Sequence, residues 1–159
     1  AGSILSGNGN TGADPEVLVA ISNLSANMGA ANITEIEFVT TSFDKSDGGN
    51  IDVLVRFNEP VTVTGTPRVS ITNGNQGSGS GRGPHLANYL SGSTTNELTF
   101  RCTIGAANSA TNAGDILVIG TNATALNSGT IKDTGEGTVA TITNTSAQGT
   151  AAGSITVAA

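Results

Sequence analysis

The chain has 159 residues, 22 of them glycine, and a net charge of −6 with only 11% charged residues. This length favours one domain. Its six cations are scattered and form no basic face, so we expect no nucleic-acid partner. The longest apolar run, residues 17–21, is far shorter than the ~20 residues of a membrane helix, so we expect no membrane partner either.

The N-terminal segment, residues 1–13, has the composition of turns. It contains Gly7-Asn8-Gly9-Asn10-Thr11-Gly12, which matches the dinucleotide-binding pattern G-x-G-x-x-G. That site needs a strand before the pattern and a helix after it. Only Ile4 and Leu5 precede it, so we expect no cofactor. The start at Ala1-Gly2, without methionine or a visible signal peptide, favours synthesis in a cytoplasm; a cleaved leader outside this sequence is the alternative.

Residues 14–28 predict a short amphipathic helix. Asp14 suits the N-cap, Pro15 the first helical position and Gly29 the C-cap. A strand through residues 16–21 is the alternative. Four apolar side chains recur at helical spacing, and we expect them to contact either a partner subunit or the body of the domain: Val17, Ile21, Leu24 and Met28.

From Ile33 onward the hydrophobic pattern has the period of two that is typical of half-buried strands. Ile36 and Phe38 share one face of the first strand. The clearest alternation covers residues 51–57, where every second residue is apolar and a core candidate: Ile51, Val53, Val55 and Phe57. Pro60 lacks the N–H that a sheet ladder needs, so we expect this strand to end there and a short segment, residues 61–63, to follow.

Four oxygen-bearing side chains cluster within nine residues near the turn that precedes this strand: Asp44, Asp47, Asn50 and Asp52. They are candidates for a calcium site. Their spacing departs from the EF-hand, which places oxygen ligands at positions 1, 3 and 5 and a glutamate at 12. An ordinary turn rich in Asp and Gly is the favoured interpretation, and we expect no metal.

Further strands are predicted over residues 69–71, 86–90, 98–104, 116–119, 130–132, 137–143 and 154–157. The Gly- and Ser-rich loop over residues 73–84 lacks the Lys-Ser/Thr pair of a phosphate-binding loop. A solvated hairpin loop is the favoured interpretation of this segment. Alternatively, its Arg82 contacts a carboxylate of a partner.

Short strands separated by turn signals predict an all-β fold, an antiparallel β-sandwich. We expect an N-terminal arm over residues 1–32, the sandwich over residues 33–143, and a C-terminal strand or tail over residues 144–159.

Three segments resemble successive signatures of one family: FNEPVTVTGTP at 57–67, YLSGSTTNELTF at 89–100 and NSGTIKD at 127–133. They are similar to the immunoglobulin-like repeat of large bacterial and cyanobacterial surface adhesins, which has related copies in virion proteins of marine phages. The resemblance covers about residues 33–139. It implies an immunoglobulin-like sandwich without a catalytic centre, used as a spacer, adhesive or decorating module. The chain departs from the family in having one copy, its own terminal segments and an enlarged loop over residues 73–84.

The sequence offers little for catalysis. A cysteine nucleophile needs a base within hydrogen-bond reach, and the chain has one cysteine, Cys102, and one histidine, His85. Cys102 shares the apolar face of its strand with Leu98 and Phe100, so we favour a buried small hydrophobic residue over a catalytic pair. We therefore expect no enzyme and no catalytic residue.

The expected function is structural. A single module without a visible secretion signal favours a phage capsid decoration or cement protein on the virion surface. Its expected partner is a capsid or other virion protein in a multicopy or homo-oligomeric assembly. The alternative is an adhesive or spacer module of a bacterial cell-surface protein.

Overall fold

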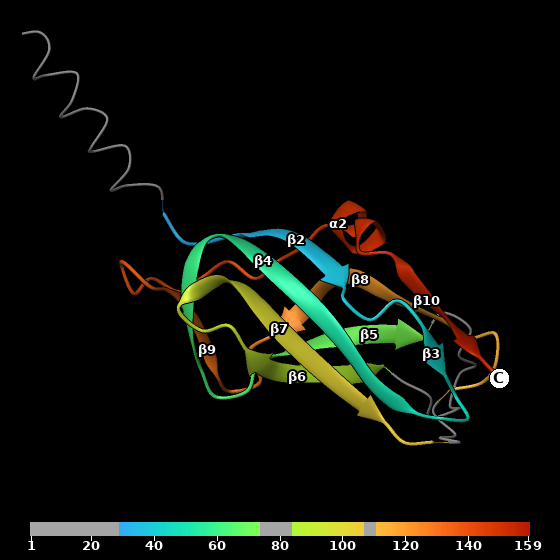
Figure 1. Ribbon diagram of the computed structural model, residues 1–159. Helices are drawn as coiled ribbons and strands as arrows, with labels where there is room; N and C mark the ends of the chain where they lie inside the picture. Colours follow the sequence, from blue (N-terminus) through green and yellow to red (C-terminus); the bar gives the residue numbers. More distant parts are fainter. Residues whose placement is uncertain (1–28, 74–83, 107–110) are drawn as a thin grey trace, which may run out of the picture.

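The computed structural model describes residues 29–73, 84–106 and 111–159 (Figure 1). Its strands are β2 (Ile33–Phe38), β3 (Phe43–Asp44), β4 (Gly49–Thr64), β5 (Arg68–Asn73), β6 (His85–Ser91), β7 (Thr95–Ile104), β8 (Ile116–Ala125), β9 (Thr130–Asp133) and β10 (Ser154–Ala158). One short helix, α2 (Ser146–Ala151), precedes β10. The predicted all-β class is confirmed.

The strands form one hydrogen-bonded path in the order β2-β4-β7-β6-β5-β8-β10-β3, and β9 pairs with β4. Neighbours are antiparallel except for β10 and β3, which are parallel. The sheet curls, so that β2–β4–β7 and β5–β8–β10 enclose the core between them (Figure 1). The segment that leads into β2 and the C-terminus after β10 lie at opposite ends of the long axis (Figure 1).

The core follows from the period-two pattern of the strands. Because successive side chains of a strand point to opposite faces, every second residue is buried over residues 51–57 of β4 and 98–104 of β7. Tyr89 packs its ring edge-on against Phe100, with the ring centroids 6.1 Å apart and the planes at 74°. Burying each large apolar side chain stabilises the fold by roughly 1.5–3 kcal/mol. The largest fully buried side chains are Phe57, Phe100, Ile36, Ile51, Ile71, Leu98, Leu117, Ile131, Ile155, Val53, Val55 and Val61.

Strand β4 corrects the prediction that Pro60 ends a strand. β4 runs through Pro60 to Thr64. On one edge, its residues up to Arg56 pair continuously with β7, and after a register shift Val61 again pairs with β7. On the other edge, β2 pairs with residues up to Phe57 and β9 pairs with Val61–Thr64. Pro60 therefore stands where the ladder changes partner, a position at which its missing N–H costs no hydrogen bond.

The strand predicted over residues 137–143 is wrong. This segment makes only isolated bridges, between Val139 and Lys132 and between Thr141 and Asn32. Its backbone still completes neighbouring elements, because the N–H of Ala140 donates to Ile131 O and that of Thr141 donates to Ala31 O. The segment follows the sheet without building a ladder of its own.

The C-terminal residues, expected as a strand or tail, contribute both α2 and β10 to this single unit. Helix α2 was not predicted. Its N-cap is Thr145, whose hydroxyl accepts from Gln148 N, while Gln148 Oε1 accepts from Thr145 N at 2.8 Å. This reciprocal capping box stabilises a helix start.

Helix α2 also covers the outer edge of β2. Gln148 Nε2 donates to Ile33 O at 3.2 Å, and the N–H of Phe38 donates to Ala152 O at 3.2 Å. An open strand edge is a template for pairing with another chain. These contacts block that edge and close the curled sheet.

Candidate interaction surface

Acidic residues are absent from four strands that are far apart in the sequence. Strands β5, β6, β8 and β10 contain no Asp or Glu, and Arg68 is their only Lys or Arg. They are neighbours, in the order β6-β5-β8-β10. We call their outer surface the acid-free face. The protein has a net charge of −6, but none of its acidic residues lies on these four strands.

The acid-free face also exposes large apolar side chains. Leu86 and Leu90 on β6 are 38% and 47% exposed, and Ile116 on β8 is 39% exposed. The register places Leu86 opposite Ser70 of β5 and Ile116 opposite Thr156 of β10. Small hydroxyl side chains therefore separate the apolar ones. Apart from Arg68, this surface carries no charge and can be desolvated at little electrostatic cost.

A pocket of about 340 Å³ adjoins this face. Val118 and Ser154, which pair directly across β8 and β10, line one side. Gly149, Thr150 and Gly153, from α2 and the turn after it, line the other side. Gly149 lets the helix approach closely, since a Cβ there would lie only 2.4 Å from Ile119 O. The pocket can accept an apolar side chain from a partner.

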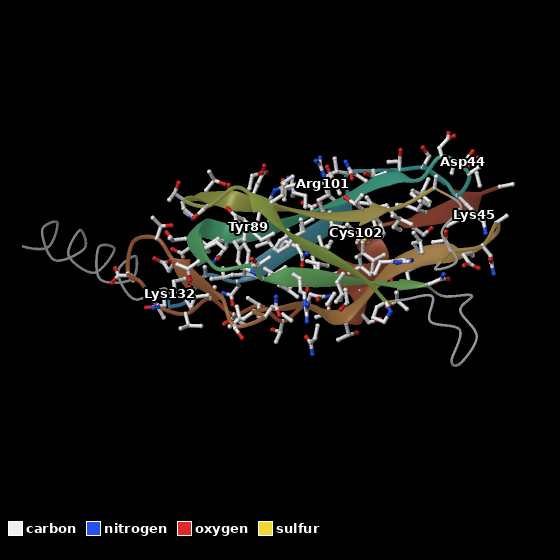
Figure 2. All side chains as sticks on the ribbon, turned by 90° about the horizontal axis from the view of Figure 1, so that it is seen from below. Asp44, Lys45, Tyr89, Arg101, Cys102 and Lys132 are labelled. Atoms are coloured by element: carbon white, nitrogen blue, oxygen red, sulfur yellow. The ribbon has the colours of Figure 1, made fainter. Side chains whose placement is uncertain are left out.

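The opposite outer surface, on β2, β4 and β7, is charged. Arg101 forms a bidentate pair with Asp52, with both N–O distances below 3 Å. Figure 2 shows Arg101 on this outer side of the molecule. Arg56 contacts both Glu35 and Glu97. The hydrogen bond from Arg101 lowers the pKa of Asp52, and that to Glu97 raises the pKa of Arg56. On this surface Arg56 and Arg101 are thus both paired with carboxylates.

The four calcium candidates do not converge on a common centre. Asp44 Oδ1 accepts from the N and Oγ of Ser46, and these bonds lower the pKa of Asp44. Asp52 is paired with Arg101, and Asn50 Oδ1 accepts from Thr103 Oγ1 at 2.7 Å. Asp47 lies in the exposed turn between β3 and β4. Among the residues that the structure describes, no group of three or more His, Cys, Asp or Glu could hold a metal ion.

Cys102 and His85 both lie inside the fold. Cys102 is 8% exposed, and burial raises the pKa of its thiol. His85 is 7% exposed, and its Nε2 has no hydrogen-bond partner, so this nitrogen does not activate the thiol. The geometry favours Cys102 as a small core residue.

Glu59 and Asp133 form a pair of neighbouring carboxyl groups. The pKa of Glu59 is raised, first by its hydrogen bond to Asp133 and then by burial. The pKa of Asp133 is lowered, chiefly by the bond that its Oδ1 accepts from Glu136 N at 2.6 Å. Asp133 therefore holds the negative charge and fixes the turn after β9, while Glu59 holds a proton more readily than usual.

Several predicted features lie outside the described residues. They are the glycine-rich pattern at 7–12, the helix expected over 14–28 with its contact candidates Val17, Ile21, Leu24 and Met28, and Arg82. Within the described ranges, α2 is too short to cross a bilayer, and no helix there meets the length and hydropathy that a membrane span requires.

The sequence patterns alone did not predict the acid-free face. No single segment reveals it, because each of its strands is only five to ten residues long. The usable signal was the absence of Asp and Glu from residues 68–73, 85–91, 116–125 and 154–158. That signal acquires meaning only when the strand order makes these segments neighbours.

Comparisons of the chain with protein-family models, with curated proteins and with solved structures found no match.

Proposed function

We propose that this chain is a non-enzymatic structural protein that decorates a phage capsid on the virion surface, and that it docks through the acid-free face. One observation carries the proposal: four neighbouring strands without an acidic residue, bearing Leu86, Leu90 and Ile116 at 38–47% exposure. Protein docking sites are depleted of charge at their centre and take up apolar side chains. The adjoining pocket offers a place for one anchoring side chain.

The fold that we propose is an immunoglobulin-like sandwich, and the strand order supports it. Immunoglobulin-type domains place strands A, B, E and D in one sheet and C, F and G in the other. With β2 as strand A, the order A-B-E-D corresponds to β2-β4-β7-β6 and C-F-G to β5-β8-β10. The additional β3 and β9 extend this plan. Strand β6, which the plan places in the sheet of β2, β4 and β7, also pairs with β5 over residues 85–88 and so joins the two sheets.

Pelleting with purified capsids tests the proposal. The probe is the capsid of the phage whose genome carries the gene, freed of this protein and mixed with the purified full chain. We expect the chain to pellet with capsids, and Leu86→Lys or Ile116→Lys to weaken binding at least tenfold. Val39→Lys is the matched control, because Val39 is 52% exposed but lies outside the acid-free face. Failure of the unmodified chain to pellet at saturating concentration would refute capsid decoration.

The alternative function is an adhesive or spacer module of a bacterial cell-surface protein. One observation favours it: the segment that leads into β2 and the C-terminus after β10 lie at opposite ends of the molecule, which suits modules joined end to end (Figure 1). Gene context separates the two functions. Neighbouring capsid genes support decoration, whereas flanking repeats in one long reading frame with a leader support the surface module.

A further inference from the structure

Four of the described buried polar residues gather at one end of the fold. Asn73, His85, Thr111 and Asp115 are each at most 7% exposed. They lie where β5 ends and where β6 and β8 begin. Buried polar groups are costly unless they are hydrogen-bonded. Their concentration at one end therefore needs a physical account.

Asp115 ties the strands of this end together. Its Oδ2 accepts from Asn73 Nδ2 at 2.7 Å and from Asn112 N at 2.8 Å. Its carbonyl accepts from Val157 N at 2.8 Å, and the N–H of Gly114 donates back to Val157 O at 2.8 Å. The turn before β8 is thereby bonded to both β5 and β10.

Strand β3 joins the same end from the other side. It pairs in parallel with β10, with Val157 opposite Phe43. Lys45, directly after β3, donates from Nζ to Thr111 O at 3.3 Å. Figure 2 shows Lys45 beside Asp44 at this end of the molecule. Four strands thus meet around Asp115 and Thr111.

His85 is the titratable group enclosed in this end. It begins β6, opposite Ile71 of β5, and its buried Nε2 has no hydrogen-bond partner. Burial lowers the pKa of His85, while the charge of Asp115 acts in the opposite direction. Among the described residues, Asp115 faces it from the turn before β8, and Lys45 reaches the neighbouring turn from β3.

Protonation changes what this position requires. A neutral imidazole can leave one nitrogen without a donor, whereas an imidazolium carries an N–H on both nitrogens. The added N–H at Nε2 would have no acceptor where it lies, and the charge would be buried. The protonated ring is therefore stabilised by moving to water.

We propose that His85 is an acid-operated latch: its neutral form keeps this end of the fold closed, and its protonation releases the bonds through which Asp115 holds β5 and β10. The inference does not rest on the proposed docking to a capsid. It concerns the stability of the module itself, whose one end loosens locally as the surroundings become acidic.

The direction of the pH dependence follows from proton linkage. A histidine in the opened or unfolded chain titrates near 6.5. Because the closed form binds the proton less readily, the opened form gains protons first as the pH falls below about 6.5. One proton then raises the opening equilibrium constant by up to about tenfold per pH unit until His85 also titrates in the closed state.

The experiment uses the full chain between pH 7.5 and 5.0, a range above the ordinary pKa of Asp and Glu side chains. Since His85 is the only histidine, its imidazole C–H resonances report its titration without ambiguity. Amide hydrogen exchange, corrected for the intrinsic effect of pH, is followed at Val157 and Gly114, which bond to this end, and at Ala140, which bonds to Ile131 elsewhere.

We expect His85 to titrate below 6.5, and the protection of Val157 and Gly114 to fall at least fivefold by pH 5.0 while that of Ala140 stays constant. His85→Gln should abolish the pH dependence; His85→Phe serves if the Gln variant does not fold. Titration at or above 6.5, or equal pH dependence in the unmodified and variant chains, would overturn the latch. The titration alone decides the matter if neither variant folds.

Discussion

Glu59 and Asp133 bring two carboxyl groups together where one edge of β4 changes its partner from β2 to β9. The pKa of Glu59 is higher in the folded chain than its ordinary value. The stability that protonated Glu59 contributes to the fold is therefore fully present below the pKa of Glu59 in the unfolded chain. This stability is lost as the pH rises through the pKa of Glu59 in the folded chain. Once Glu59 is ionised, the pair carries two like charges that oppose folding.

We expect Glu59→Gln to be more stable than the unmodified chain at pH 7, because the amide keeps a donor toward Asp133 and removes one charge. The difference should shrink toward pH 4, because Glu59 itself takes up a proton as the pH falls and its pKa is raised. Urea denaturation midpoints at the two pH values measure this difference. The effect of His85 titration cancels in the difference, because both proteins contain His85. Asp47→Asn in the exposed turn after β3 is the control. An equal gain in both variants would attribute the effect to net charge instead.

At the scale of elements, α2 depends on the absence of a side chain at Gly149. Alanine normally stabilises a helix interior relative to glycine by about 1 kcal/mol. Here an added Cβ would lie 2.4 Å from Ile119 O and 2.9 Å from Gly120 O. Two backbone carbonyls of β8 cannot yield as a side chain can, so α2 must shift.

We therefore expect Gly149→Ala to destabilise the fold by roughly 1–3 kcal/mol, the usual cost of overpacking, measured by thermal or urea unfolding. Ser146→Ala on the exposed first turn of the same helix should change stability by much less. A stabilised Gly149→Ala variant would show that α2 packs on β8 less closely than described.

Sequence reasoning succeeds where one strand alone carries the signal. The alternation of Ile51, Val53 and Val55 predicts their burial, and all three are fully buried. Sequence reasoning fails where the bounds of a strand depend on the strand that it pairs with. Pro60 is compatible with a strand because one edge of β4 changes its partner from β2 to β9 at that point, while the register with β7 shifts on the other edge; no local pattern reports this. Helix α2 did have a local signal, the Thr145-x-x-Gln148 capping box, but its six residues are too few for a hydrophobic period.

The candidate surface is less predictable than the fold for the same reason. Leu86 and Ile116 are ordinary strand residues in the sequence, and they become parts of one surface only because β5 pairs with both β6 and β8. The polar end around Asp115 likewise joins Asn73 to a turn 42 residues away. Such long-range neighbours are set by topology.

At the scale of the whole molecule, charge is distributed unequally between two surfaces. Docking through the acid-free face should depend little on salt, because screening acts on charges and this face has only Arg68. We expect capsid binding to change less than about threefold between 50 and 500 mM NaCl. Docking through the charged surface of β2, β4 and β7 would instead weaken strongly over that range. Pelleting at the two salt concentrations distinguishes the surfaces.

The two lysines stand at opposite ends of the molecule, Lys45 at one and Lys132 at the other (Figure 2). Side-chain amines are therefore available for chemical coupling only near the tips. A sensor chip or bead that captures lysine would hold the protein by one end of its long axis. The outer surfaces of the curled sheet would then face the solution. Capture through either lysine thus leaves the acid-free face accessible to a partner without an engineered attachment site.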